Sequence, residues 1–448
     1  MQYIPNAEND WPEMLAAIGF KNLEDLITLL PESLRLQKPL SLPPPLSEME
    51  LVAHLLSLSE KNKPGKMISF LGAGAYDHYI PAVVDHILRR SEFYTAYTPY
   101  QPEISQGTLQ AIFEFQTLIC QLTGMEVANA SVYDGASAVA EAVLMAHRLK
   151  GKKRCFLSAT LHPEAQKVTR TYAAPLGIEF LEIPYASAGL TDLDFLAQKI
   201  DEDTFAVVLQ QPNFFGCLED LEKAGQIIQA RGALFIVAIM EPLALALLQP
   251  PGVAGADIVV GEGQSFGLPL SFGGPYVGFF ATKESFLRAL PGRLVGETVD
   301  LQGRRGFVLA LATREQHIRR EKATSNICTN QALCALAVLV YLTILGKEGL
   351  KKLAQINLSK CTYAKKILGS KFSLPFSAPT FNEFVLSLPK DSSEVLAQLL
   401  PAGIIGGFPL QKFYPHLQRE ILICLTEKIS KEYIDLLKEK LENLVEGA

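Results

Sequence analysis

Short apolar runs alternate with amphipathic segments through the middle of the chain. The apolar runs predict strands at 155–159, 178–185, 205–210, 233–240, 258–260 and 276–282. The segments between several of these runs, including 163–176 and 218–231, predict helices. Nearly continuous apolar strands between helices indicate a mostly parallel sheet that helices cover on both faces. The pattern therefore predicts an α/β fold for this part of the chain.

The pattern changes at both ends of this region and predicts three parts. Residues 1–65 predict an N-terminal helical arm with a proline-rich linker, and residues 66–330 form the large α/β domain. Residues 331–448 predict a small α+β domain with an antiparallel sheet. Its expected elements are an apolar helix at 332–345, a helix at 350–369, strands at 383–388 and 421–426, and a helix at 431–445.

Composition limits the classes of function. The chain has 448 residues, is 48% hydrophobic and carries a net charge of −6, which fits a large core and argues against general nucleic-acid binding. Its seven cysteines are scattered singly. Because none forms a C-x-x-C pair, we expect neither a metal site nor a disulfide framework. Isolated cysteines of this kind favour a reducing compartment.

Targeting signals are not expected in this sequence. Residues 1–6 have neither the basic start nor the apolar core of a signal peptide. The longest apolar stretch, 332–345, is shorter than the roughly 20 residues that span a bilayer. We therefore expect a cytoplasmic protein without a membrane segment.

Polar residues follow several predicted strands and form a first set of candidates. His162, Asn213, Glu241 and Gln264 lie just beyond strand ends, which is where ligands bind in parallel sheets. His162 could equally be a helix-start histidine with a satisfied hydrogen bond. The segment Asp134, Gly135, Ala136 and Ser137 opens a helix, and a helix start rich in small residues suits an anion. From spacing alone, Asp134 could equally cap that helix.

A proline-broken loop forms a second set. Residues 94–107 contain Tyr97, Thr98, Tyr100, Glu103 and Ser105. Such a loop has no hydrogen-bond ladder of its own, so its polar groups need partners elsewhere. It is either a packed surface loop or the wall of an active site.

A basic cluster lies between residues 293 and 322 of this acidic chain. Guanidinium groups there could bind carboxylates or phosphates, although acidic residues lie among them and part of the cluster can be a paired surface. The cluster lacks the interleaved aromatic residues of an RNA-binding module. Its candidates for an interface are Arg304, Arg305, Arg314, Arg319 and Arg320.

Three segments carry a resemblance to a known family. They are Thr-Pro-Tyr-Gln-Pro-Glu-Ile-Ser-Gln-Gly at 98–107, the glycine-rich stretch 257–278, and the segment 313–331. The chain resembles the P-protein family of the glycine cleavage system, and within it the subunits that match the N-terminal half of the P-protein. The resemblance implies the fold of fold-type I pyridoxal-phosphate transferases. It also implies a part in glycine dehydrogenase (decarboxylating), an oxidoreductase of glycine catabolism.

The resemblance also points to a lost anchor for the cofactor. In the catalytic half of the P-protein the glycine-rich loop runs His-Lys-Thr-Phe, and here the matching residues 263–266 are Gly-Gln-Ser-Phe. Gln264 therefore replaces the Schiff-base lysine, and an amide nitrogen is not nucleophilic enough to form an imine. In related folds the residue at His162 stacks on the pyridine ring, the helix start at 135–137 holds the phosphate, and an aspartate stands at Glu241. We expect neither Asp134 nor Glu241 to favour the cofactor.

The resemblance implies that the chain works through partners. Pyridoxal phosphate is expected on a separate catalytic subunit, in an α2β2 heterotetramer that decarboxylates glycine and transfers the aminomethyl group to the lipoyl arm of the H-protein. This chain would have no catalytic residue of its own. Tyr97, Tyr100 and Glu103 are our candidates for walls of the shared site, and the arginine cluster is expected at the subunit interface.

Two other functions stay open. The chain could be an autonomous pyridoxal-phosphate lyase or aminotransferase that uses another lysine, such as Lys283, although this residue lies beyond the second strand. It could also be a purely structural subunit without contact to any active site.

Overall fold

The computed structural model describes residues 7–446, and the chain divides into two compact units, 1–63 and 64–448. Residues 1–6, on which the expectation about a signal peptide rests, lie outside the described residues. The predicted division of the second unit at residue 330 stays a prediction.

Among residues 7–63, the first unit contains the helices α1 (Trp11–Ala17), α2 (Leu23–Ile27) and α3 (Glu48–Ser59). Both α2 and α3 begin with a capping box, in which the side chains of Asn22 and Ser47 accept hydrogen bonds from the backbone N–H groups of Asp25 and Glu50. Such caps satisfy N–H groups that have no partner within the helix. Because Leu15 is the buried hydrophobic side chain here, these helices depend largely on local caps.

The second unit is built around a seven-stranded sheet in the order β2-β8-β7-β6-β5-β3-β4. Its strands are β2 (Val127–Ala128), β3 (Arg154–Ser158), β4 (Glu179–Ile183), β5 (Thr204–Gln210), β6 (Leu234–Ile239), β7 (Ile258–Glu262) and β8 (Gly278–Thr282). The strands from β4 to β7 are parallel neighbours, whereas β8 is antiparallel to β7 and β2 is antiparallel to β8. The predicted mostly parallel sheet is confirmed.

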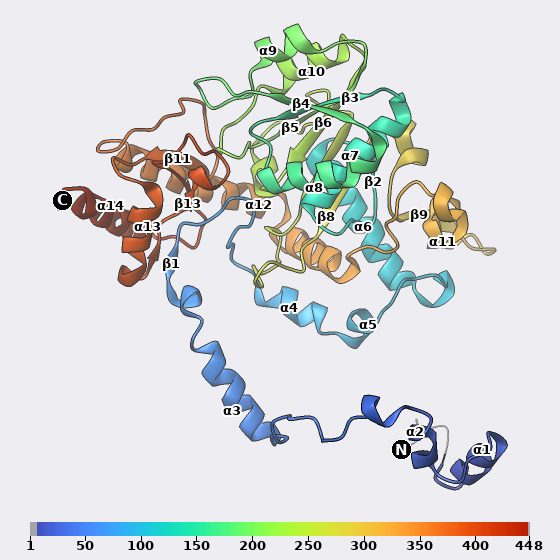
Figure 1. Ribbon diagram of the computed structural model, residues 1–448. Helices are drawn as coiled ribbons and strands as arrows, with labels where there is room; N and C mark the ends of the chain where they lie inside the picture. The colour runs from blue at the N-terminus through green and yellow to red at the C-terminus, as the bar shows by residue number, and fades with distance from the viewer. Residues whose placement is uncertain (1–6, 447–448) are drawn as a thin grey trace. The chain divides into compact units, whose positions relative to one another are not determined.

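Helices cover both faces of this sheet. Alternate side chains of a strand point to opposite faces, and here both sets are apolar, so both faces must be buried. On β6, Phe235 and Val237 belong to an apolar cluster with α6 (Gln106–Thr123), α10 (Leu221–Gln229) and α12 (Ala332–Leu368). Leu234 and Ile236 belong to a second cluster with α7 (Gly135–Lys150) and α8 (Pro163–Ala173). Figure 1 shows α7 and α8 together on one side of the sheet.

The remaining elements of the second unit include a hairpin that sequence analysis did not predict, β9 (Leu294–Val299) paired with β10 (Arg305–Ala310). Its turn, Asp300 to Gly303, interrupts the apolar pattern and hides the strands. The other α-helices outside the C-terminal part are α4 (Ala82–Leu88), α5 (Ser91–Tyr94), α9 (Leu193–Lys199) and α11 (Gln316–Arg319).

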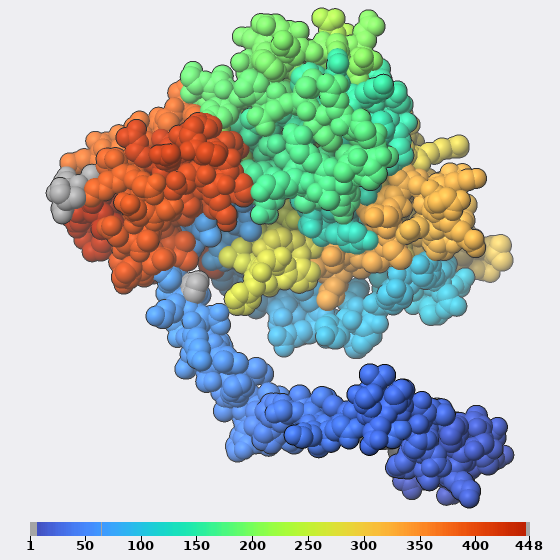
Figure 2. Space-filling view, in the orientation of Figure 1, coloured from blue at the N-terminus to red at the C-terminus, as the bar shows by residue number. Residues whose placement is uncertain are grey.

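The C-terminal part carries an antiparallel sheet in the order β11-β14-β13. Its elements are β11 (Glu383–Ser387), α13 (Ser392–Leu399), β13 (Phe408–Pro409), β14 (Glu420–Cys424) and α14 (Lys431–Glu446). A strand from far earlier in the chain, β1 (Ile68–Ser69), pairs in parallel with β12 (Ile404–Ile405). Residues 68–70 therefore belong with this part, which forms the red and orange lobe in Figure 2, whereas sequence analysis assigned them to the large domain.

One long helix, α12, replaces the two helices predicted at 332–345 and 350–369. Its course is interrupted at Gly346, whose φ of +56° is a conformation that glycine adopts easily. Among the described residues, α12 is the helix that is long and apolar enough to cross a membrane, but half of its most apolar window is buried inside the unit. A core helix has the same composition, and α12 packs against α6 and the sheet as such a helix does.

A buried ionic network joins the large sheet to the C-terminal part. Nε2 of His78 lies 3.1 Å from a carboxylate oxygen of Glu241, which follows β6, and Nδ1 lies 2.8 Å from Glu427, which follows β14. The amides of Asn382 and Asn357 donate to the same two carboxylates at 3.1 Å each. Burial alone would lower the pKa of His78, but the carboxylates raise it to about 10. Against the opposite effect of burial, the imidazolium holds the pKa of Glu427 at about 2.

We expect the substitution His78→Gln to destabilise the second unit in a pH-dependent way. Since the pKa of His78 is raised from 6.5 to about 10, its stabilising charge is fully present below pH 6.5 and is lost as the pH rises toward 10. The variant should lose about 3 kcal/mol of unfolding free energy near pH 6, because two buried carboxylates lose their cation. The loss should shrink toward pH 10.

Denaturant titrations at several pH values between 6 and 10 measure this difference. The matched control is His86→Gln, since His86 is an exposed histidine on α4 and its replacement should change the unfolding free energy by less than about 0.5 kcal/mol. A constant difference between the wild type and His78→Gln across this range would contradict the charged network.

Candidate functional site

The carboxyl ends of the parallel strands form one edge of the sheet, and a cavity of about 380 Å³ opens there. We call it the sheet-edge cavity. Its lining includes Asp134 and Ala136 from the start of α7, His162 after β3, Phe214 after β5 and Glu262 at the end of β7. Several predicted residues therefore lie around one hollow, where parallel sheets bind ligands.

Gln264, which follows β7, is buried beside this cavity and has a full set of protein partners. Its Oε1 accepts a hydrogen bond from the backbone N–H of Tyr76 at 2.8 Å. Its Nε2 donates to the carbonyl of Tyr76 at 2.9 Å and to that of Leu268 at 2.7 Å. A lysine could replace the two donors but not the acceptor, because an ammonium group has no acceptor. The amide therefore binds one residue of the chain from both sides.

The segment 72–76 that Gln264 binds lies against the sheet edge. The carboxylate of Glu383 on β11 accepts from the N–H of Ala73 at 2.7 Å and from the hydroxyl of Tyr76 at 2.8 Å. Nε2 of His162 lies 2.9 Å from the carbonyl of Ala73. Gly74 has φ of +100°, and a Cβ there would come within 2.5 Å of the His162 ring. The chain's own backbone is therefore packed into this part of the site.

The start of α7 is occupied by carboxylates of the protein. Asp134 accepts from the N–H of Ser137 at 2.7 Å and forms a capping box, which confirms the interpretation as a helix cap. Glu262 accepts from the N–H of Gly135 at 2.9 Å. Burial raises the pKa of Glu262 to about 8, although hydrogen bonds from backbone N–H groups oppose this. A Cβ on Gly135 would lie 2.9 Å from that of Glu262, so glycine is needed for this approach.

Three further predicted residues have structural partners. His162 caps α8, since its Nδ1 accepts from the N–H of Glu164 at 3.2 Å, and burial lowers its pKa, so the ring is neutral. This is the helix-start role, and the ring lies edge-on to Phe214. Asn213 donates to the carboxylate of Glu219 at 2.8 Å and holds the turn after β5. The carboxylate of Glu241 is paired with His78, as described above.

These contacts decide whether pyridoxal phosphate fits this chain. Gln264 cannot form an imine. A phosphate at the start of α7 would meet Glu262 and Asp134, two carboxyl groups, instead of free N–H donors. The carboxylate of Glu241, which would have to pair with a pyridinium, is bound by an imidazolium. The residues present do not fit the cofactor.

The positions of two lysines bear on the alternative of an autonomous enzyme. Lys283 follows β8 and forms an ion pair with Asp257, which precedes β7. Because β8 is antiparallel to β7, this pair lies at the opposite end of the strand from Gln264, and Lys283 does not line the sheet-edge cavity. Lys412 does line it, and its ammonium group lies 5.7 Å from the ring centre of Phe408.

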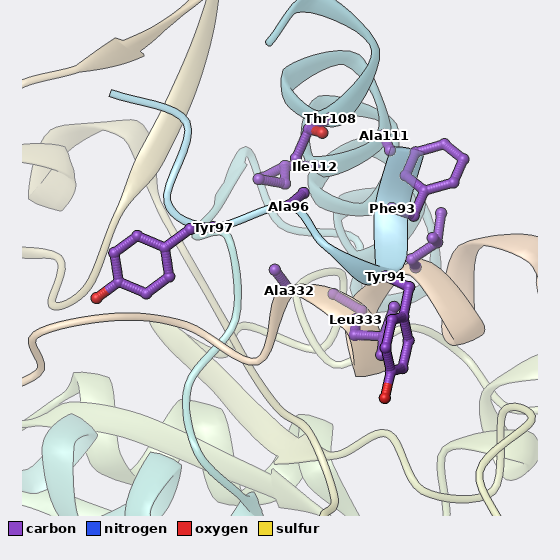
Figure 3. Close-up of a pocket in the computed structure, with 11 residues that line it drawn as sticks. Phe93, Tyr94, Ala96, Tyr97, Thr108, Ala111, Ile112, Ala332 and Leu333 are labelled. Carbon is purple, nitrogen blue, oxygen red and sulfur yellow. The ribbon is translucent and has the colours of Figure 1, made fainter. Parts of the chain in front are cut away.

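The second predicted set lies elsewhere. Residues 94–107, which we call the tyrosine loop, do not line the sheet-edge cavity. Tyr97 is 82% exposed and Glu103 is exposed as well. Tyr97 lines a separate cavity of about 70 Å³ beside α5, α6 and the start of α12. Figure 3 shows the ring of Tyr97 well apart from that of Tyr94. Ser105 is half-buried before α6.

One buried arginine holds the rest of the tyrosine loop. Arg293 donates to the hydroxyl groups of Thr98 and Tyr100, both at 2.9 Å. Sequence analysis counted Arg293 in the basic cluster but assigned it no role in the site. Tyr76, His78, Glu262 and Glu383 were also missed. Tyr76 and His78 end a glycine-rich stretch that matches no known fingerprint, and Glu262 and Glu383 are single acidic residues in otherwise apolar strands.

The predicted interface arginines have different surroundings. Arg304 and Arg305 lie on the exposed β9–β10 hairpin and pair with Asp300 and Glu297. Arg314 is half-buried and donates to the carbonyls of residues 290 and 292. Arg319 and Arg320 are exposed, and within residues 7–446 their side chains have no ion-pair or hydrogen-bond partner. Their place at an interface stays a prediction.

Comparisons with known proteins agree with these features. The family model of the glycine cleavage system P-protein matches residues 1–441. A probable glycine dehydrogenase (decarboxylating) subunit 1 of Desulforamulus reducens is 52% identical over 444 residues, with 98% of this chain and 99% of the relative covered. The crystal structure of a glycine decarboxylase (P-protein) of the glycine cleavage system, in inhibitor-bound form, has a TM-score of 0.88 and 44% identity, and the match covers 99% of this chain and 100% of that one.

A more distant structure supports the fold alone. The cysteine desulfurase of Escherichia coli is 16% identical and has a TM-score of 0.63 over 90% of this chain and 99% of its own. Its fold is that of fold-type I pyridoxal-phosphate enzymes, as the sequence predicted. The full-length family match and the close relatives show that the chain belongs to the glycine cleavage system P-protein family.

Proposed function

We propose that this chain is the non-catalytic subunit of a two-subunit glycine dehydrogenase (decarboxylating). The observation that carries the proposal is Gln264, a buried amide with protein partners on both its oxygen and its nitrogen. The names of the close relatives, which call them subunit 1 of this enzyme, support a second subunit as partner.

The second subunit holds pyridoxal phosphate and carries out the chemistry on glycine. The cofactor acts there as the electron sink of the decarboxylation. The assembled enzyme, an α2β2 heterotetramer, transfers the aminomethyl group to the lipoyl arm of the H-protein. We place the enzyme in the cytoplasm, in keeping with seven cysteines that are all free thiols.

This chain contributes a wall to the partner's active site. The side chains of Tyr97 and Glu103 are exposed, and Tyr100 is 52% exposed although its hydroxyl binds Arg293, so all three have surface available to a second subunit. The interface also includes Arg319 and Arg320, whose exposed guanidinium groups suit carboxylates of a partner. Exposed and polar groups of this kind are poor contributors to the fold of their own chain.

A second candidate function rests on one observation, the position of Lys412. It is the lysine among the residues lining the sheet-edge cavity. An autonomous pyridoxal-phosphate enzyme would have to use it. Lys412 is exposed and lies beside two phenylalanine rings, so its ammonium group is solvated. Solvation stabilises the charged form and does not favour the neutral amine that attacks an aldehyde.

We expect that Gln264→Lys will not restore a bound cofactor. The new lysine leaves the N–H of Tyr76 without its acceptor, and Glu262 and Asp134 still occupy the start of α7. The purified variant, mixed with pyridoxal phosphate, should show no stable absorption band above that of free cofactor and no label after borohydride reduction and peptide mapping at residue 264.

The matched control is Lys412→Gln in the wild-type chain, treated in the same way. A reducible adduct that disappears in this control would support the autonomous alternative. A stable adduct on residue 264 of the lysine variant would show that the pocket still accepts the cofactor. It would overturn the conclusion that the residues present do not fit pyridoxal phosphate.

We also expect Tyr97→Ala and Glu103→Ala to lower the activity of the reconstituted enzyme. Both side chains are exposed, so their loss should leave folding and assembly intact. Glycine–bicarbonate exchange, measured with the catalytic subunit and the H-protein, should fall by at least about tenfold if these side chains position groups in the site.

The control for this pair is Val253→Ala, which changes a side chain that is also exposed, at 64%, and is remote from the tyrosine loop in sequence. Size-exclusion chromatography confirms that each variant assembles. Unchanged exchange in both loop variants would favour the purely structural subunit.

A further inference from the structure

Arg293 has an unusual environment for an arginine outside the sheet-edge cavity. It immediately precedes β9 and is only 3% exposed. One terminal nitrogen donates to the hydroxyls of Thr98 at 2.9 Å and Thr329 at 2.8 Å, and the other donates to the hydroxyl of Tyr100 at 2.9 Å. A buried cation is tolerated only when partners offset its charge. The two terminal nitrogens have such partners on two separate segments, whereas Nε has no hydrogen-bond partner among the described residues.

The two segments are far apart in the sequence and irregular in structure. One terminal nitrogen of the guanidinium binds both segments, the tyrosine loop (94–107) through Thr98 and residues 311–331 through Thr329. Neither contributes a strand to the large sheet. Their relative position therefore depends on side-chain contacts instead of a backbone ladder.

Further contacts gather around the same arginine. Its guanidinium carbon lies 5.3 Å from the ring centre of Tyr100, within the range of a cation–π contact. Nε lies 3.5 Å from a carboxylate oxygen of Glu315, which is buried and offsets the charge. The ring of His317 meets that of Tyr100 edge-on at 6.0 Å. The result is a polar cluster in which the tyrosine loop and the segment 311–331 share one centre.

We propose that Arg293 is a positioning residue that sets the shape of the wall this chain offers to the partner's active site. It is buried and does not itself touch the substrate. By holding Thr98 and Tyr100, it fixes the part of the tyrosine loop next to the exposed Tyr97 and Glu103. This inference rests on the proposed function, and it adds a residue that neither the family motifs nor the exposed surface identifies.

Lysine cannot fill this role, although it keeps the charge. The guanidinium is planar and presents donors in a fixed fork, which binds Thr98, Tyr100 and Thr329 at the same time. An ammonium group is a compact point charge with three donors on a flexible stem. In Arg293→Lys the two segments should therefore stay folded but lose their fixed relation.

The test uses the full chain, reconstituted with the catalytic subunit and the H-protein. For Arg293→Lys we expect kcat of glycine–bicarbonate exchange to fall by about tenfold or more, with KM for glycine unchanged within about twofold, because the residue does not touch the substrate. Amide hydrogen exchange should become faster at residues 94–105 and 311–331. Assembly, measured by size-exclusion chromatography, should be unchanged.

Two other variants make the test specific. Tyr100→Phe keeps the ring but removes one acceptor, and it should give a smaller fall in kcat in the same direction, even if Arg293→Lys folds poorly. The matched control is Arg154→Lys, which replaces a half-buried arginine at the start of β3 that is paired with Glu179 and Asp201. This control should leave both kcat and hydrogen exchange unchanged.

The outcomes separate the two proposals. Wild-type kcat and hydrogen exchange in both Arg293→Lys and Tyr100→Phe would overturn the positioning role. If Tyr97→Ala and Glu103→Ala still lowered activity, the proposed wall would stand without it. If those variants also had full activity, the proposed wall itself would fall. A fall in kcat with a matching rise in KM would indicate direct contact with the substrate and would also overturn the positioning role.

Discussion

The amide of Gln264 binds Tyr76 at both its N–H and its carbonyl, and much of the second unit depends on that contact. It fastens the segment between β1 and α4 to the end of β7, where the large sheet is open. The same segment is held by Glu383 from β11 of the C-terminal part. An uncharged side chain with a donor and an acceptor can hold a backbone in this way. A lysine at this position would give up half of the contact.

Acidic side chains take over the remaining polar positions of the sheet edge. Glu262 binds the start of α7, Glu241 binds an imidazolium, and Glu383 binds the segment 73–76. Burial raises the pKa of Glu262 to about 8 and that of Glu383 to about 7, so each is stable only because neighbouring N–H or O–H groups bind it. All three carboxyl groups therefore have partners within the chain. Under the proposed function, Gln264 in place of a Schiff-base lysine is one change in a connected set.

The sheet was predictable because fully apolar runs such as β6 have one physical explanation, burial on both faces. The place of Gln264 after a buried strand was also predictable, since a family motif marks this position. The β9–β10 hairpin was not, because the polar residues of its outer half interrupt the apolar pattern. The union of β1 with β12 was not either, since a pair of two-residue strands joined across more than 300 residues leaves no local pattern. The roles of His78 and Arg293 come from contacts that only the folded chain brings together.

The two candidate regions differ in what they demand of their residues. The amide of Gln264 has partners within the chain on both its oxygen and its nitrogen, so substitution there acts first on stability. In the tyrosine loop, the inner residues are fixed by Arg293 while Tyr97 is 82% exposed. Burying Arg293 beneath exposed side chains costs desolvation free energy and adds no apolar core. We expect this cost to be offset when a partner binds the exposed side chains. Under the proposed function, the chain's own residues close the sheet edge, whereas the exposed part of the tyrosine loop stays uncovered for the partner subunit.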